Sequence, residues 1–532
     1  MTLTRKNLIL FEDSGSEECT ASVQHQCARS LNSGHREGVI KKRMRLGDLL
    51  IQAKMVTPDD LSRALAIQAE RGGRLGSLLV ANGAITQERL EAFIHRMPAE
   101  PADIAKTKID PIDLLSLLVR MIYVEHLETV REFIDTIKLP YNIVTDLVQM
   151  AVDRKLLHTL GSRDSDNLLD AKFTFTEAGQ RWAENALKQL RYTGPAPVTI
   201  EEFADQVNLQ KVTNETITFD RIRTSLGYLT VEDTMIEHVG PALNSGRAIL
   251  LYGPPGNGKT SVAMSFASAF TDVIYIPYAV IVEGQIMRVF DPSVHTELAS
   301  APANDDGMMS FIRTGEYDAR WVPCKRPFII TGGELTLEML DLRYDESANF
   351  YEAPLHVKAL GGCFVIDDFG RQLVSPKNLL NRWIVPLESR FDYLKLHTGK
   401  SFTIPFEELI IFSTNLEPEE LMDPAFLRRL PYKIEVAGPK LEVFKTIFRN
   451  ECERQSLPFS EEAFDFIVDK ITREKGMELA NYQVRFIIDQ VVSTCRFMGE
   501  GAHFETRFIE YAIDNLRVKR HGAPRTSSAS VS

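Results

Sequence analysis

The amino-acid sequence predicts an α/β protein in which a domain with a parallel sheet precedes a helical domain. Three observations predict this fold class. Between residues 193 and 435, helical stretches alternate with five short apolar strands, AILLYG, DVIYIPY, PFIIT, CFVID and LIIFSTN. This alternation is typical of a parallel sheet covered on both faces. A glycine-rich turn, GPPGNGKT, connects one apolar strand to a helix. From residue 436 to residue 517, apolar residues recur at helical spacing.

The chain has 532 residues, which is too long for one hydrophobic core and indicates about three or four folded domains. Proline-containing and polar stretches mark the boundaries between them. In chain order, we expect a disordered segment at 1–42, a duplicated domain at 43–97, a linker at 98–109, a helical domain with a short hairpin at 110–192, the α/β domain at 193–435, the helical domain at 436–517 and a disordered tail at 518–532.

Charge and cysteine content argue against several classes of protein. A net charge of −12 disfavours a general phosphate-binding surface, although a local basic patch can still exist. The six cysteines are scattered without a C-x-x-C pair, which favours reduced thiols in the cytoplasm over a disulfide framework or a zinc site. The N-terminus makes a poor signal peptide. No apolar run approaches the roughly 18 residues of a transmembrane helix, so we expect no membrane span.

The first folded domain contains the same motif twice. Residues 45–68 read RLGDLLIQAKMVTPDDLSRALAIQ, and residues 74–97 read RLGSLLVANGAITQERLEAFIHRM, 29 residues further on (74 − 45). Each copy combines Arg-Leu-Gly, an apolar pair, a turn and a helix that Thr57 or Thr86 can cap. One copy is too small to bury its own apolar face, so we expect the two copies to pack together.

These motifs resemble the MshE N-terminal (MshEN) domain, which also precedes ATPases of type II secretion and type IV pili and can bind cyclic di-GMP. That family carries two 24-residue motifs separated by five residues, as this sequence does. The departures are Lys54, where glycine is typical, and Met97 in place of glutamine. The resemblance implies either a cyclic di-GMP site or a docking module that has lost the ligand. The implied site residues are Arg45, Leu46, Gly47, Gln68, Arg74, Leu75 and Gly76.

Residues 110–192 predict three helices, a short hairpin and a final helix, an order that resembles a winged helix. Winged helices often bind DNA through a basic recognition helix. The corresponding stretch, NIVTDLVQMAVDRKLL, carries both signs of charge, and the domain has 13 acidic against 10 basic residues. Because phosphate neutralisation needs clustered cations, we expect a protein-binding or structural role, with DNA binding as the alternative.

The strongest motif for chemistry is G-x-x-x-x-G-K-T, with an apolar strand at Ile249–Tyr252 before it and a helix after it. Glycines let backbone N–H groups turn inward around phosphate oxygens, and the helix directs its positive N-terminus at them. Lys259 would reach the β- and γ-phosphates, and Thr260 would hold Mg²⁺. The predicted ATP-binding residues are Gly253, Pro254, Pro255, Gly256, Asn257, Gly258, Lys259 and Thr260.

Two further apolar strands end in polar residues that suit the same chemistry. CFVIDDFGRQ places Asp367 at a strand end, where its carboxylate can hold Mg²⁺ through water. Asp368 follows at a position where a base can orient the attacking water. LIIFSTN ends in Asn415, whose amide can hydrogen-bond the γ-phosphate or the water. The strand ends therefore predict a hydrolytic site beside the glycine-rich turn.

Three arginines follow these strands. MDPAFLRRLPYKIEV contains Arg428 and Arg429, and NYQVRFIIDQV places Arg485 in an otherwise apolar helix. A guanidinium in apolar surroundings is costly unless it meets an anion, so we expect Arg485 to face one. For each arginine alone, a surface salt bridge is the alternative.

The order of these motifs resembles the AAA+ ATPase family over roughly residues 215–517, where a P-loop domain with a parallel sheet carries a helical lid. The resemblance implies that Asn415 is the sensor 1 residue and Arg485 the sensor 2 residue. It also implies that Arg428 and Arg429 are candidate arginine fingers, which act on the nucleotide of a neighbouring subunit. Fingers that act in trans imply a homo-oligomeric ring, most often a hexamer.

Two features depart from the AAA+ pattern. Asp368 stands where glutamate is usual, which puts the hydrolysis rate in question more than nucleotide binding. The spacing of 108 residues between Lys259 and Asp367 (367 − 259) is longer than usual. Within it, residues 290–321 predict an insertion or extended loop that serves as a ring-pore loop or as a partner surface.

The sequence thus predicts a cytoplasmic, bacterial AAA+ ATPase that uses ATP and Mg²⁺ to remodel a partner protein complex, with cyclic di-GMP as a regulatory input. An association with secretion or pilus machinery comes from the MshEN resemblance alone. The alternative hypothesis is a nucleotide-dependent DNA-binding regulator that acts through the winged helix.

Overall fold

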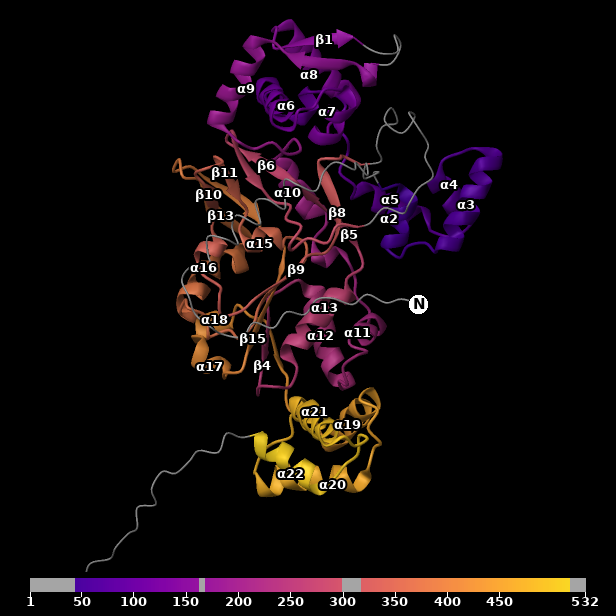
Figure 1. Ribbon diagram of the computed structural model, residues 1–532, viewed down its shortest axis with the longest axis vertical. Coiled ribbons are helices and arrows are strands. Elements are labelled where there is room, and N and C mark those ends of the chain that lie inside the picture. Colours follow the sequence, from indigo (N-terminus) through magenta and orange to yellow (C-terminus); the bar gives the residue numbers. More distant parts are fainter. Residues whose placement is uncertain (1–43, 162–167, 299–316, 517–532) are drawn as a thin grey trace, which may run out of the picture. The chain divides into compact units, whose positions relative to one another are not determined.

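The computed structural model describes residues 44–161, 168–298 and 317–516 (Figure 1). The expected disordered segments at 1–42 and 518–532 lie outside the described residues, as does the central part of the predicted insertion. None of the described helices is both long and apolar enough to cross a bilayer.

The duplicated domain folds as two successive pairs of helices. The first pair is α2 (Leu46–Gln52) and α3 (Pro58–Arg71), and the second is α4 (Leu75–Ala81) and α5 (Gln87–His95). Each longer helix begins at a threonine. Thr57 Oγ1 accepts a hydrogen bond of 3.2 Å from a backbone N–H three residues on, and Thr86 Oγ1 accepts the equivalent bond at 3.4 Å.

Gly47 and Gly76 bring the two helices of each pair close together. A Cβ built on Gly47 would lie 2.6 Å from a methyl carbon of Leu61, and one on Gly76 would lie 2.9 Å from a methyl carbon of Leu90. The two leucines are 29 residues apart (90 − 61), as the two glycines are (76 − 47). The same glycine–leucine contact therefore forms in both copies, and both glycines have a packing role.

Lys54 adopts a backbone conformation similar to that of Gly83, the equivalent residue of the second copy. Its φ is 54°, and Gly83, 29 residues further on (83 − 54), has a φ of 70°. Both residues lie in the turn that follows a short helix. The turn thus keeps its shape in the first copy even though an L-residue in this region is strained.

The domain at 110–192 has the element order that the sequence predicts. Helices α6 (Pro111–Glu125), α7 (Val130–Ile137) and α8 (Tyr141–Asp153) precede an antiparallel hairpin of β1 (Leu157–Gly161) and β2 (Lys172–Phe175). An isolated bridge from Thr129 to Lys172 extends this hairpin, and α9 (Glu177–Gln189) follows. The 3₁₀ turns at Ala105–Thr107 and Leu168–Asp170 lie before α6 and before β2.

The central sheet of the α/β domain confirms the predicted fold class. Five parallel strands lie in the order β16-β4-β15-β12-β9. Helices α10 (Ile200–Leu209), α11 (Phe219–Ser225) and α12 (Asp233–Ser245) precede the sheet in the chain, with a 3₁₀ turn at Val212–Asn214. The strands are β4 (Ile249–Tyr252), β9 (Phe328–Thr331), β12 (Cys363–Ile366), β15 (Leu409–Thr414) and β16 (Tyr432–Glu435).

The two faces of this sheet are covered by different helices (Figure 1). Ile249 and Leu251 of β4 pack in one cluster with Val262 and Phe266 of α13 (Lys259–Ala269). Leu250, between them, packs in another cluster with residues of α16 (Pro376–Ser389). This alternation along one strand buries both faces, as expected for a parallel sheet.

One predicted strand of the central sheet is wrong. The stretch DVIYIPY forms β5 (Val273–Pro277), but β5 pairs in an antiparallel manner with β8 (Trp321–Lys325) outside the central sheet. Its place as a fifth strand is taken by β16, which the sequence did not indicate. All five residues of β5 are buried, and a continuous apolar run of this kind reveals burial but not the direction of the partner strand.

Smaller sheets and short helices complete the α/β domain. A five-stranded sheet has the order β10-β11-β7-β6-β3, and β13 pairs with β14 as a hairpin. The bounds are β3 (Val198–Thr199), β6 (Ala279–Val282), β7 (Gln285–Arg288), β10 (Arg343–Asp345), β11 (Phe350–Glu352), β13 (Phe391–Lys395), β14 (Ser401–Pro405), a 3₁₀ turn (Glu338–Leu340), α15 (Leu355–Lys358), α17 (Pro418–Leu421) and α18 (Pro424–Leu427).

The C-terminal domain is helical throughout its described residues. Phe444, Phe448, Phe464 and Ile487 are fully or almost fully buried in its core, which explains the helical periodicity of the sequence. The elements are α19 (Leu441–Arg454), α20 (Glu461–Asp469), a π-helical turn (Lys470–Glu474), α21 (Asn481–Met498) and α22 (Thr506–Asn515).

Candidate functional site

The turn between β4 and α13 has the backbone geometry of a phosphate cradle. Gly253, Gly256 and Gly258 have φ angles of 130°, 81° and 88°, which L-residues rarely adopt. Gly258 is also the N-cap of α13. The positive end of that helix favours phosphate at the same place. The backbone of this turn leaves room for a phosphate group, and the predicted binding of ATP by residues 253–260 stays a prediction.

Lys259 lies inside the turn. Its Nζ donates hydrogen bonds of 2.9 Å to the carbonyl oxygens of Gly253 and Pro254, and the residue is only 6% exposed. Burial lowers the pKa of Lys259, and the nearby charges of Asp367 and Asp368 oppose that shift. Within the part of the chain that the structure describes, this buried ammonium has two carbonyl partners and no direct bond to a carboxylate, which suits it to an incoming phosphate anion.

Thr260 and Asp367 come from separate elements and meet beside the turn. The Thr260 hydroxyl donates a hydrogen bond of 2.7 Å to Asp367 Oδ2. Thr260 is the second residue of α13, and Asp367 directly follows β12. A hydroxyl and a carboxylate oxygen are the donor set that Mg²⁺ prefers, so these residues fit the predicted metal site.

Asp368 and Asn415 form the next contact. Asn415 Nδ2 donates a hydrogen bond of 2.9 Å to Asp368 Oδ1, and Asp368 has a φ of 47°. Asn415 directly follows β15, which lies between β4 and β12 in the sheet. The sheet order therefore places an amide between the glycine-rich turn and the acidic pair. The left-handed backbone at Asp368 is a strained conformation of the kind that gathers at functional sites.

Gln372 holds the acidic turn and was missed by the sequence prediction. Its Nε2 donates hydrogen bonds to the carbonyl oxygens of Asp367 at 3.0 Å and Asp368 at 3.3 Å, and its Oε1 accepts one of 2.8 Å from the N–H of Gly370. Gln372 is 9% exposed. A lone glutamine in a loop carries no motif, so only the fold reveals this positioning role.

The N-terminus of α21 contacts the P-loop directly. Asn481 Nδ2 donates a hydrogen bond of 3.1 Å to the carbonyl oxygen of Asn257, and the N–H of Tyr482 donates one of 2.9 Å to the carbonyl oxygen of Gly256. A Cβ on Gly256 would lie 2.2 Å from the Tyr482 ring. The sequence analysis did not indicate either of these α21 residues and named only Arg485 of this helix, as a residue that meets an anion.

The structure contradicts the environment expected for Arg485. Its side chain is 69% exposed, and its Nε lies 3.5 Å from Asp489 Oδ2 one turn further along α21. The apolar residues around it in sequence point to the opposite, buried side of the helix. The argument that Arg485 must meet a buried anion is therefore wrong, and its sensor 2 role stays a prediction.

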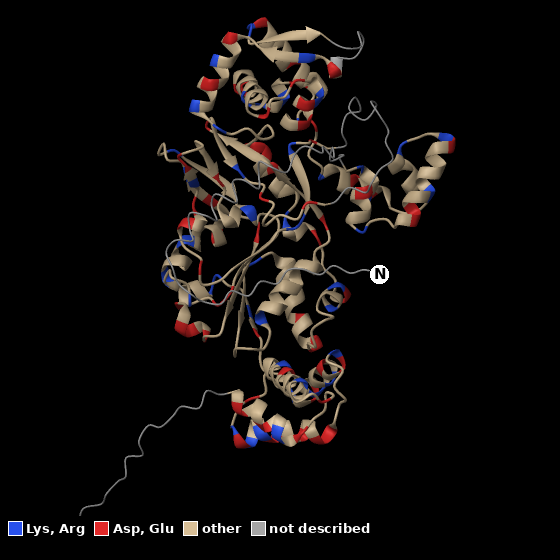
Figure 2. Ribbon diagram, in the orientation of Figure 1, with Lys and Arg blue, Asp and Glu red and all other residues tan. Residues whose placement is uncertain are grey.

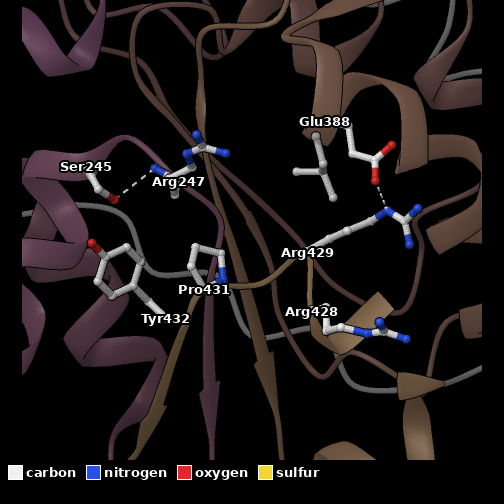
Figure 3. A pocket seen from close by; sticks show the side chains of 8 residues that line it. Ser245, Arg247, Glu388, Arg428, Arg429, Pro431 and Tyr432 are labelled. Atoms are coloured by element: carbon white, nitrogen blue, oxygen red, sulfur yellow. Dashed lines mark hydrogen bonds and ion pairs between the residues drawn. The ribbon is translucent and has the colours of Figure 1, made fainter. Parts of the chain in front are cut away.

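Arg428 and Arg429 lie at the amino ends of the parallel strands, whereas the P-loop lies at their carboxyl ends. They precede β16, whereas the P-loop follows β4, and the two strands run parallel. A strand of four residues separates its two ends by roughly 13 Å. Both arginines line a pocket of about 480 Å³, together with Ser245, Arg247, Leu387, Glu388, Pro431 and Tyr432 (Figure 3).

The candidate cyclic di-GMP residues occupy equivalent places in the two copies. Arg45 and Arg74 are both exposed N-cap residues of the short helices. Gln68 is half-buried, and its Nε2 donates a hydrogen bond of 2.8 Å to the carbonyl oxygen of Gly73. Leu46 and Leu75, next to the arginines, are half-buried. Both arginines thus lie at the surface, while Gly47 and Gly76 pack against leucines of the longer helices.

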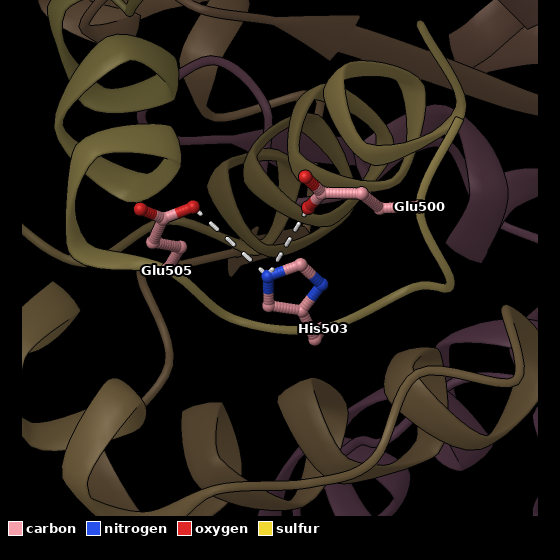
Figure 4. Close-up of side chains that lie close together, drawn as sticks. All are labelled: Glu500, His503 and Glu505. Atoms are coloured by element: carbon pink, nitrogen blue, oxygen red, sulfur yellow. Dashed lines mark ion pairs between the residues drawn. The ribbon is translucent and has the colours of Figure 1, made fainter. Parts of the chain in front are cut away.

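One further group of potential cation ligands lies in the loop between α21 and α22. His503 Nε2 is 3.6 Å from Glu500 Oε2 and 4.0 Å from Glu505 Oε2 (Figure 4). His503 Nδ1 is 2.8 Å from the carbonyl oxygen of Gly501. These exposed charges pair with one another when the imidazole is protonated, which accounts for their proximity.

Comparisons with known proteins add little beyond the C-terminal domain. A family model described as a domain of unknown function (DUF8689) matches residues 440–515. No curated protein matches the chain.

Three solved structures resemble the chain distantly. They are a point mutant of RuvB from Thermotoga maritima (14% identity, TM-score 0.29, covering 57% of this chain and 73% of that one), NtrX from Brucella abortus (12%, 0.33, 64% and 61%) and the FIGL-1 AAA domain (15%, 0.30, 57% and 78%). The chain thus spans less than two thirds of the NtrX chain. The α/β fold with a parallel sheet is therefore described from this chain's own strand order and from the backbone of its glycine-rich turn.

Proposed function

We propose that the chain is an AAA+ ATPase that binds ATP with Mg²⁺ at the P-loop and hydrolyses it. The observation that carries the proposal is the hydrogen-bonded series from Thr260 to Asp367 and from Asp368 to Asn415, directly beside the glycine-rich turn. These side chains come from α13, β12 and β15, so the fold brings them together across more than 100 residues of sequence.

Each residue has a separate task in this reaction. Lys259 exchanges its carbonyl partners for phosphate oxygens when ATP enters the turn. Thr260 and Asp367 would hold Mg²⁺, which would neutralise phosphate charge. Asp368 accepts a proton from the attacking water, and Asn415 fixes the orientation of that carboxylate through its amide.

The test compares two variants of the full chain. Lys259→Ala should lower ATP affinity at least about tenfold, because a charge-assisted contact to phosphate is lost. Asp368→Asn retains the shape and the Asn415 bond, so ATP should still bind while turnover falls about a hundredfold. Fluorescent-nucleotide titration and phosphate release measure the two effects.

Lys188→Ala, on the exposed side of α9, is the matched control and should change neither quantity. Unchanged turnover in both site variants would remove the ATPase proposal.

The position of Arg428 and Arg429 favours catalysis in which one subunit acts on the nucleotide of another. Arg428 and Arg429 lie at the amino ends of the parallel strands, and the P-loop lies at the carboxyl ends. The two arginines therefore suit the nucleotide of a neighbouring copy better than the nucleotide of their own chain. We therefore propose a homo-oligomeric ring, a hexamer by resemblance. In this ring, hydrolysis would drive the remodelling of a partner protein complex.

The N-terminal domains would provide regulation and partner binding. Leu65 and Ile94, at equivalent positions, are 45% and 46% exposed, and with Arg45 and Arg74 they offer a repeated surface suited to a two-fold ligand such as cyclic di-GMP. If the site has lost that ligand, the same surface is a docking face. An association with secretion or pilus machinery remains part of this proposal only through the MshEN resemblance.

A protein partner is the more consistent choice for the winged-helix-like domain. The exposed side of α8 presents Asn142, Asp146, Gln149 and Asp153, so two carboxylates and no cation face the solvent over these residues. Figure 2 shows both signs of charge interspersed along α9. DNA binding requires clustered cations, and salt-sensitive duplex binding by the full chain would support that alternative.

A further inference from the structure

Three arginines, and not only the predicted pair, line the pocket at the amino ends of the parallel strands. Arg247 lies two residues before β4, whereas Arg428 and Arg429 lie before β16. Its N–H donates a hydrogen bond of 3.1 Å to Ser245 Oγ, which shapes the turn that leads into β4. Figure 3 shows the three arginine side chains and Glu388 around this pocket.

The charges in the pocket are only partly balanced. Arg429 Nε donates a hydrogen bond of 2.6 Å to Glu388 Oε1, so this pair is neutral. Arg428 Nε donates to the carbonyl oxygen of Pro424 at 3.2 Å. Among the residues that the structure describes, neither Arg247 nor Arg428 forms an ion pair with a carboxylate. Two guanidinium charges therefore line one pocket without a counter-charge, an arrangement that favours an anion.

The pocket cannot cradle a nucleotide in the way the P-loop does. None of its eight lining residues is a glycine, so it offers side-chain cations in place of a turn of backbone N–H groups. It therefore suits phosphate groups that a second surface presents to it. On the proposed function, that surface is the P-loop of a neighbouring copy.

We propose that Arg247 is a third arginine that contacts the phosphates of the ATP bound to a neighbouring copy. This inference rests on the proposed ring. Arg247 lies just before β4, and the P-loop of the same chain follows β4. The amino end of this strand therefore contacts the nucleotide of a neighbouring copy, and its carboxyl end contacts the nucleotide of its own chain. A planar guanidinium donates two parallel hydrogen bonds to a phosphate, which lysine cannot reproduce.

The experiment uses complementation between full-length chains. Arg247→Ala should bind ATP normally but turn it over about tenfold to a hundredfold more slowly, the loss expected for one charge-assisted contact. Arg247→Lys should recover only part of that loss. Mixing Arg247→Ala with Lys259→Ala should restore turnover, because the second chain keeps its arginines and the first keeps its P-loop.

The controls separate the possible failures. Arg181→Ala removes an exposed arginine of α9 and should leave turnover unchanged. If Arg428→Ala plus Arg429→Ala is slow and is rescued by Lys259→Ala while Arg247→Ala is fully active, this inference fails and the ring proposal stands. If Arg247→Ala is slow but is not rescued, Arg247 acts within its own chain and the inference is overturned. If no arginine variant loses activity, the ring proposal itself fails.

Discussion

Lys54 carries a local strain that glycine would relieve. An L-residue in the left-handed region costs roughly 1–2 kcal/mol, part of which glycine would lose again through its greater freedom in the unfolded chain. The turn is exposed, with Lys54 itself at the surface. The left-handed φ therefore makes Lys54 a position where the sequence departs from the local backbone preference.

We predict that Lys54→Gly stabilises the first helix pair by about 0.5–1 kcal/mol. Slower hydrogen exchange of the amides of α2 and α3 in the full chain would measure the gain. Gly83→Ala is the matched control, because it places an L-residue in the same turn of the second copy, and exchange in α4 and α5 should become faster. Faster exchange in Lys54→Gly would contradict the strain argument.

At the scale of elements, local motifs were predictable and long-range contacts were not. The P-loop, the threonine caps and the polar strand ends each depend on residues close in sequence, and the structure places them as expected. The contact between Asn257 and Asn481 spans 224 residues, so no local pattern could indicate it. Likewise, β5 has a strand-like sequence, but its antiparallel partner β8 lies far along the chain and is set by the whole domain.

The exposure of Arg485 illustrates another limit of sequence reasoning. Helical spacing puts its apolar neighbours Val484 and Ile488 in the core, and both are at most 1% exposed. Arg485 is on the other side of the same helix. An apolar sequence neighbourhood is therefore a poor guide to burial in a helix, because adjacent residues point about 100° apart.

The two glycine–leucine contacts should respond differently to the same substitution. Leu90 is 4% exposed and cannot turn away from a new methyl group, whereas Leu61 is half-buried and can. We predict that Gly76→Ala destabilises the duplicated domain by about 1–3 kcal/mol through overpacking and that Gly47→Ala costs less. Hydrogen exchange across residues 44–97 measures the stability lost in each variant. Equal losses would show that the conformational freedom of Leu61 does not reduce the cost of the substitution.

At the scale of the whole molecule, charged residues connect the duplicated domain to the α/β domain. Arg96, at the end of α5, forms an ion pair with Asp272, which follows α13 closely. Asp272 also lies 3.6 Å from Arg326, whose Nε donates a 3.0 Å hydrogen bond to buried Glu215. Burial alone would raise the pKa of Glu215, but Arg326 and Arg221 together lower it. The P-loop helix thus ends in an ionic network that α5 also joins.

This network predicts how ligand binding would affect turnover. Calorimetry should detect cyclic di-GMP binding to the full chain, and Arg45→Ala plus Arg74→Ala should abolish it, because both guanidinium groups that can stack on the bases are removed. Asp272→Asn should still bind the ligand but lose its effect on ATP turnover. An absence of binding to the wild-type chain would leave the duplicated domain as a docking module.

The placement of the P-loop and the arginines at opposite ends of the parallel strands has a kinetic consequence. Each copy carries the glycine-rich turn at one end of the parallel strands and guanidinium groups at the other. In the proposed ring, a solitary copy would therefore hold two incomplete halves of different sites. Specific activity should therefore rise with protein concentration and level off once assembly is complete. Dilution alone would then switch the enzyme off, and the cell could set the onset of ATP consumption through the abundance of the chain.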